Sequence, residues 1–148
     1  MRVLASISLV LMVLFSARLA LAQAEGYVPG LGDIMTSIQM RHIKLWFAGK
    51  SKNWDLAIYE LERLRQSLED AATLYTGIPA ELVGATVDPI KAIDVAIKAK
   101  DGAEFVKGYG ALTEACNGCH RGIGREFIVI QVPSTSPFGD QSFAPPKR

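Results

Sequence analysis

Five consecutive residues near the end of the chain, Cys116-Asn117-Gly118-Cys119-His120, form a Cys-x-x-Cys-His motif that contains both cysteines of the sequence. On a helix, positions i and i+3 point in nearly the same direction, so the two thiols could bond to the two vinyl groups along one porphyrin edge. The histidine beside the second thiol could then bind the iron. This spacing is typical of the covalent attachment of one haem c, with Cys116 and Cys119 as thioether positions and His120 as the proximal iron ligand.

Three other kinds of site could use these residues. The two cysteines could form a structural disulfide, act as a thioredoxin-like redox pair, or supply half of a zinc site. A zinc site needs two further ligands, and the only other histidine is His42. A redox pair is expected beside a strand–helix–strand pattern, which the surrounding residues do not have. Haem attachment is therefore the favoured interpretation.

The N-terminus has the pattern of a secretory signal peptide. Arg2 precedes an apolar run over residues 3–15, and the sequence Ala-Leu-Ala at 20–22 offers a small-x-small cleavage site. We therefore expect residues 1–22 to be a signal peptide that is cleaved during export to the periplasm. Covalent haem attachment to this motif takes place on the exported side of a bacterial membrane, so the motif and the signal peptide predict each other.

The rest of the chain, residues 23–148, has the length of a single domain. No later stretch has the length that a membrane helix needs, so we expect no stable membrane insertion. The chain has 16 Lys and Arg against 15 Asp and Glu. This balance gives no indication of a nucleic-acid partner.

Apolar residues recur with a helical period through most of this domain. The pattern predicts four helices, which cover residues 33–48, 53–75, 88–100 and 101–123. Four amphipathic helices with mostly short connections predict an all-α fold, an antiparallel four-helix bundle with covalently bound haem between facing helices. On the fourth helix one apolar stripe includes the motif, at Phe105, Tyr109, Leu112, Cys116, Cys119 and Ile123.

Cap residues support the predicted helix starts. Asp33 and Asn53 are the expected caps of the first two helices, and Gly49 is expected to end the first. Asp88 precedes a proline, which suits the start of the third helix. Asp101, followed three residues later by a glutamate, forms a capping pair for the fourth helix.

Residues 127–148 form a C-terminal tail rich in proline, serine and phenylalanine. Two outcomes are open for the tail, an extended strap along the bundle or a disordered end. We expect partial packing, because the apolar run at 127–132 would otherwise be exposed.

A signal peptide, four helices and a Cys-x-x-Cys-His motif late in the fourth helix resemble the cytochrome c prime group. These are the four-helix monohaem cytochromes of bacterial periplasms, including their low-spin, methionine-ligated relatives. The similarity covers residues 33 to about 125, and it implies thioethers at Cys116 and Cys119 and proximal ligation by His120. At the position four residues after the motif histidine, where an arginine is common in the group, this chain has Gly124.

The second axial position of the iron decides the function. In an up-down-up-down bundle the start of the first helix lies beside the end of the fourth, which favours Met35 as the sixth ligand. If Met35 only packs against the porphyrin, the iron is five-coordinate. Met40 points toward a different face of the helix. His42 shares the face of Met35, and it is expected as a satisfied interior histidine or, if the cofactor lies deeper, as a ligand.

Two functions follow from these alternatives. With His120 and Met35 both bound, the protein is an electron carrier that meets redox partner proteins in the periplasm. With an open site, it binds small gases such as NO or CO. A bundle without haem, in which the two cysteines form a disulfide, is a third and weaker interpretation. No Ser/His/Asp or Cys/His nucleophile arrangement is found, so we do not expect an enzyme. The resemblance also allows a homodimer.

Overall fold

The computed structural model describes residues 27–147, and the predicted signal peptide at 1–22 lies outside this range. Over the described residues the protein is all-helical, with four long helices, one short helix and no strand. The helices are α2 (Leu31–Lys50), α3 (Trp54–Leu74), α4 (Ala80–Gly84), α5 (Val87–Ala99) and α6 (Gly102–Gly122). The predicted all-α class is confirmed, and the arrangement is compatible with a helical bundle.

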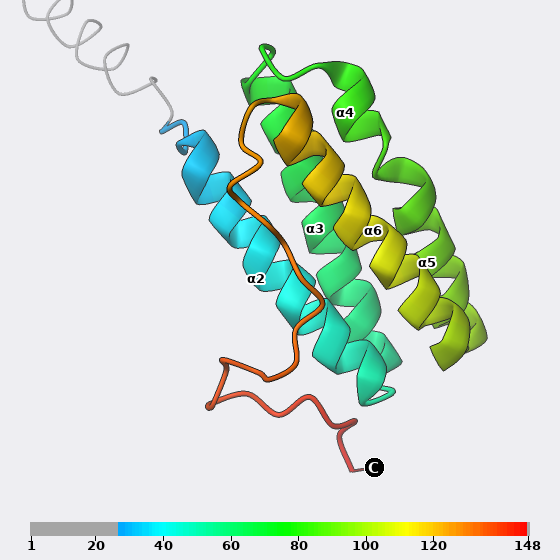
Figure 1. The fold of residues 1–148 in the computed structure, drawn as a ribbon. Helices are drawn as coiled ribbons and strands as arrows, with labels where there is room; N and C mark the ends of the chain where they lie inside the picture. The colour runs from blue at the N-terminus through cyan, green and yellow to red at the C-terminus, as the bar shows by residue number, and fades with distance from the viewer. Residues whose placement is uncertain (1–26, 148) are drawn as a thin grey trace, which may run out of the picture.

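The helices associate as two pairs. α2 packs along α3, α5 packs along α6, and contacts between α3 and α5 join the pairs. Successive long helices run in opposite directions, and α4 lies at the end of the molecule where α3 leads into α5 (Figure 1). The backbones of α2 and α6 come close at only a few positions. None of the helices in the described range is both long and apolar enough to cross a membrane.

Phe105 is the centre of an aromatic cluster in the core. Its side chain is fully buried, and its ring centroid lies 6.3 Å from that of Trp46 and 6.1 Å from that of Trp54. A Cβ atom at Gly49 would lie only 2.1 Å from Cζ of Phe105. The absence of a side chain at Gly49 therefore lets the Phe105 ring lie directly against the backbone of α2.

Two predicted helix caps are confirmed. The Asn53 side chain accepts a hydrogen bond from the amide of Leu56 at 3.3 Å. The Asp101 side chain accepts from two amides of the following turn, at 2.9 and 3.1 Å. The glutamate side of the expected capping pair is not formed, because the Asp101 amide donates instead to the carbonyl of Ala96 at 2.9 Å.

The other two predicted caps are wrong, because α2 is capped at Gly30 and α5 at Thr86, three and two residues before the predicted positions. α2 already begins at Leu31, so Asp33 lies in its first turn, where a negative charge is favoured by the helix dipole. α5 begins at Val87, which places Asp88 and Pro89 in its first turn. Proline is tolerated there because the amides of a first turn have no partner within the helix.

Two further differences concern helix ends and loops. α2 continues through Gly49 to Lys50, although the sequence predicts that it ends at Gly49. Within the predicted loop between the second and third helices, Ala80–Gly84 form α4. A helix of five residues is too short to produce a periodic apolar pattern.

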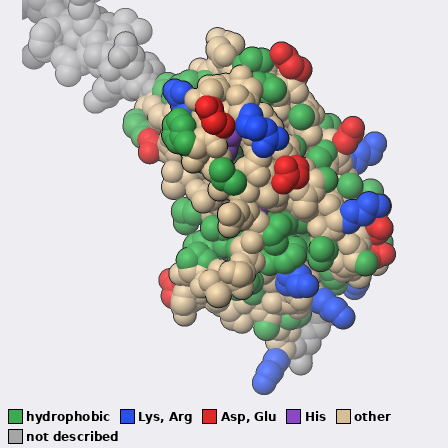
Figure 2. All heavy atoms as spheres, in the orientation of Figure 1, with side chains coloured by type: hydrophobic (Ala, Val, Ile, Leu, Met, Phe, Trp, Pro, Cys, Tyr) green, Lys and Arg blue, Asp and Glu red, His purple; other side chains and the backbone are tan. Residues whose placement is uncertain are grey.

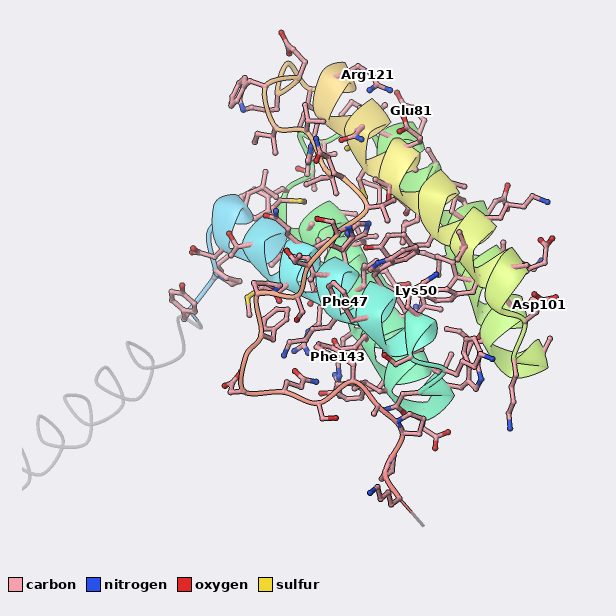
Figure 3. The ribbon with its side chains drawn as sticks, turned by 60° about the horizontal axis from the view of Figure 1, so that its bottom comes forward. Phe47, Lys50, Glu81, Asp101, Arg121 and Phe143 are labelled. Carbon is pink, nitrogen blue, oxygen red and sulfur yellow. The ribbon has the colours of Figure 1, made fainter. Side chains whose placement is uncertain are left out.

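Residues 123–147 contain no helix or strand, and this C-terminal segment runs back along α2 (Figure 1). Far along the segment, Phe143 lies beside Phe47 of α2, with ring centroids 5.6 Å apart (Figure 3). The Asn53 side chain donates to the carbonyl of Ala144 at 3.2 Å. The far half of the segment is therefore attached at the junction of α2 and α3.

The apolar run at 127–132, which is the reason to expect partial packing of the tail, is itself mostly exposed. Phe127 is 75% exposed and Val129 is 64% exposed, and only Ile130 within the run is half-buried. The segment contacts the helices through backbone and amide hydrogen bonds and through later phenylalanine rings. Some apolar side chains consequently remain on the surface, where Figure 2 shows them among charges of both signs.

Gly49→Ala is expected to destabilise the protein, because the added methyl would overlap the Phe105 ring. Overpacking of a core costs about 1–3 kcal/mol. Gly110→Ala in α6 is the control: its added Cβ has no neighbour within 4 Å, and alanine favours a helix by about 1 kcal/mol over glycine. Urea unfolding of the purified proteins measures both effects. A Gly49→Ala variant as stable as the wild type would contradict this packing.

Candidate functional site

A cavity of about 350 Å³ lies between the start of α2 and the end of α6. This volume is within the range of small-molecule and cofactor sites. α3, α4 and residues 125–130 of the C-terminal segment complete its walls. Its lining is mostly aliphatic and includes Leu31, Ile38, Leu68, Ile78, Leu82, Val83 and Ile123.

The three chemically active residues of the motif, Cys116, Cys119 and His120, all line this cavity. Both cysteines are free thiols and both are half-buried. They continue the inward face of α6, on which Tyr109 and Leu112 are fully buried. Cys116, Cys119 and His120 therefore face a mostly aliphatic cavity.

The two thiols do not have the environment of a redox pair. Burial raises the pKa of Cys116 to about 11, and the charge of neighbouring Cys119 adds to the shift. Burial also raises the pKa of Cys119. Reactive cysteines in redox motifs have lowered thiol pKa values. Both thiols are therefore protonated at neutral pH, which weighs against the thioredoxin-like interpretation.

His120 has one of its two ring nitrogens committed to the protein. Its Nδ1 lies 2.9 Å from the carbonyl oxygen of Ile128. Because a carbonyl can only accept, Nδ1 carries a proton and donates, and in the neutral ring Nε2 is the nitrogen with the free lone pair. Metal-binding histidines typically have such a partner on the second nitrogen.

Met35 lies in the wall of the same cavity as the motif, from the opposite helix α2. Its side chain is half-buried and packs against the core. Met40 is 45% exposed and lies outside the cavity lining. The structure therefore brings Met35 rather than Met40 to the motif, and iron ligation by Met35 stays a prediction.

His42 also lines the cavity, but its polar atoms are engaged by α6. Nδ1 lies 2.8 Å from the hydroxyl of Tyr109, and Nε2 lies 3.0 Å from the hydroxyl of Thr113. A neutral imidazole has a single N–H, so one hydroxyl donates to the ring and the other donates to a backbone carbonyl. His42 is thus a satisfied interior histidine, the simpler of its two expected roles.

Sequence reasoning placed Tyr109 on the inward stripe of the fourth helix but missed its hydrogen bond to His42, and it missed the roles of Thr113 and Arg125. Tyr109 and Thr113 hold His42, and Arg125 is the single Lys, Arg, Asp or Glu side chain among the described residues that line the cavity. Thr113 could have been noticed as a hydroxyl one turn before Cys116 on the inward face of α6. Arg125 reaches the cavity because of the path that the C-terminal segment takes, and no sequence pattern predicts that path.

No family model, curated protein or solved structure matches the chain. Over residues 27–147, no group of three or more His, Cys, Asp and Glu side chains is arranged to hold a metal ion. The interpretation of the cavity therefore depends on its own donor atoms.

These donor atoms suit haem c. Two free thiols, one imidazole with an available Nε2 and one thioether converge on an aliphatic cavity. Thiols for covalent attachment and nitrogen or sulfur donors for iron are the ligand types that haem requires. Arg125 adds a cation that can pair with a carboxylate.

Acid is expected to destabilise the protein through His42. Burial lowers the pKa of His42 from 6.5 to about 4, so between these pH values the unfolded chain binds the proton more readily than the folded protein does. The contribution of neutral His42 to the free energy of unfolding is complete above pH 6.5. It decreases as the pH is lowered, and the loss reaches roughly 3 kcal/mol at pH 4.

His42→Gln removes the titrating ring, so its unfolding free energy should fall less than that of the wild type over the same pH window. Denaturant unfolding at a series of pH values measures the difference, and other titrating groups cancel in the comparison. Parallel pH profiles for the two proteins would show that His42 is not the buried titrating group.

Proposed function

We propose that the protein is a monohaem c-type cytochrome that carries electrons between redox partner proteins in the bacterial periplasm. The observation that carries this proposal is the convergence of Cys116, Cys119, His120 and Met35 on one aliphatic cavity. The motif and the order of helices support membership of the cytochrome c prime group. Export through a signal peptide at 1–22 belongs to the same proposal.

Each residue of the cavity has a separate task in this proposal. Bound haem supplies a one-electron Fe(III)/Fe(II) couple. Cys116 and Cys119 supply the two thioether sulfurs. His120 supplies Nε2 as the proximal ligand, because its Nδ1 is committed to the Ile128 carbonyl. Met35 supplies a soft sulfur from the facing helix.

The remaining walls control access and charge. The aliphatic side chains exclude water from the iron ligands, and a dry surrounding influences the redox potential. Arg125 lines the cavity, its guanidinium donates to the Gly124 carbonyl at 3.1 Å, and we assign it to the propionate carboxylates of the cofactor. An electron carrier needs no catalytic acid or base beyond these groups.

The second candidate function is the binding of NO or CO by five-coordinate iron. It is favoured by the apolar surroundings of Met35, where Leu31 and Ile38 line the cavity and offer no competing ligand. A small apolar gas could occupy such a position if Met35 remains unbound.

Removal of either thiol is expected to leave at most one covalent link. The wild type should retain its haem through acid-acetone extraction, whereas Cys116→Ala or Cys119→Ala should shift the pyridine haemochrome band to the position of a single thioether. Gly118→Ala is the matched control, because its added Cβ would meet only the end of Arg121 at 3.8 Å. Haem that is extractable from the wild type would contradict c-type attachment.

Met35→Ala separates the two candidate functions. If Met35 binds iron, the oxidised wild type has the weak near-infrared sulfur-to-iron charge-transfer band. The variant then becomes high-spin, binds CO readily and has a lower potential. Met40→Ala, at an exposed position of the same helix, should leave the spectrum unchanged. A high-spin wild type that already binds CO would support gas binding instead.

A further inference from the structure

Asn117, the residue after Cys116 in the motif, joins α6 to the C-terminal segment. Its Nδ2 donates to the carbonyl of Ile130 at 2.9 Å, and the Ile130 amide donates to its Oδ1 at 2.8 Å. Asn117 is 8% exposed, so these bonds are largely shielded from water. A side-chain amide offers a donor and an acceptor side by side, which a leucine of similar size does not. The two bonds fix residue 130 against α6.

This amide bridge lies two residues from the carbonyl that meets the proximal histidine. The carbonyl of Ile128 accepts a hydrogen bond from Nδ1 of His120 at 2.9 Å, and Asn117 holds the backbone of Ile130. Both carbonyls accept from side chains of α6, so the two bonds at Ile130 also restrain the backbone at Ile128. The position of the Ile128 carbonyl therefore depends on the anchoring of Ile130.

Side-chain burial contributes little to holding this stretch of chain. Phe127, Ile128 and Val129 are 75%, 43% and 64% exposed. Ile130 is half-buried, and hydrogen bonds, including one from the Ile128 amide to the Arg125 carbonyl at 2.9 Å, hold the rest of the local backbone. The attachment of Phe143 to Phe47 is fifteen residues beyond Ile128 and too distant to orient its carbonyl.

A tight turn at the end of α6 supplies the other anchor. Gly124 has a φ of +67°, the Arg125 amide donates to the carbonyl of His120 at 2.7 Å, and the Gly124 amide donates to that of Arg121 at 3.2 Å. This is the bonding pattern of a Schellman motif, in which glycine adopts the left-handed conformation. The turn directs the chain back so that residue 128 meets His120.

We propose that Asn117 is a positioning residue, which pins the C-terminal segment so that the Ile128 carbonyl fixes the ring orientation and electron donation of His120. This inference rests on the proposed function, in which Nε2 of His120 binds haem iron. A hydrogen bond from Nδ1 to a carbonyl makes Nε2 a stronger donor. Stronger donation favours Fe(III), so the bridge lowers the redox potential.

The test compares Asn117→Leu with the wild type as haem-loaded full-length proteins. Loss of the bridge is expected to speed solvent exchange of the His120 Nδ1 proton by roughly five- to tenfold, the equivalent of one hydrogen bond. The midpoint potential is expected to rise. Nitrogen-15 NMR of histidine-labelled reduced protein measures the first quantity, and redox titration measures the second.

Phe143→Ala is the matched control, because it loosens the far end of the same segment and should move neither quantity. Gly124→Ala, which strains the turn, should shift both in the direction of Asn117→Leu and serves if that variant does not fold. Unchanged exchange and potential in a haem-loaded variant would overturn the positioning role alone. A wild type without covalent haem would overturn the proposed function and this inference together.

Discussion

The buried hydrogen bonds of His42 connect α2 to α6, and the geometry of the candidate site depends on that connection. His42 lies on α2, and its partners Tyr109 and Thr113 lie on α6. Farther along α2, Trp46 and Gly49 pack against the ring of Phe105 near the start of α6. A buried polar network is costly to break on one side, because the remaining group loses its partner. The network therefore sets the separation of α2 and α6 where the cavity begins, one turn before Cys116.

Beyond this network, three different parts of the chain meet at the cavity. α6 contributes the motif, α2 contributes Met35, and the C-terminal segment contributes the carbonyl that engages His120. Groups on packed helices are held more precisely than groups on loops. His120 is the exception, since the orientation of its ring depends on a segment without regular structure. That segment is attached by the amide of Asn117 and by the turn at Gly124.

The periodicity of apolar residues was sufficient to predict the long helices. The features that the sequence did not predict depend on contacts between residues that are distant in the chain. Apolar spacing was sufficient for the four long helices, and side-chain oxygens marked the caps at Asn53 and Asp101. The start of α2 follows Gly30, which has no side chain that could cap the helix and mark its start in the sequence. The partners of His42 are 67 and 71 residues away in sequence. Every residue has a backbone carbonyl, so the sequence cannot show that the carbonyl of Ile128 is the one that accepts from His120.

The measurement that tests this account most directly is the intact mass of the exported protein under denaturing acid conditions. Acid releases haem that is held only by coordination, whereas thioether bonds survive it. We predict a single species whose mass is that of the polypeptide after removal of residues 1–22 plus one haem. A mass equal to the polypeptide alone, with or without the loss of two hydrogens for a disulfide between Cys116 and Cys119, would contradict the central claim.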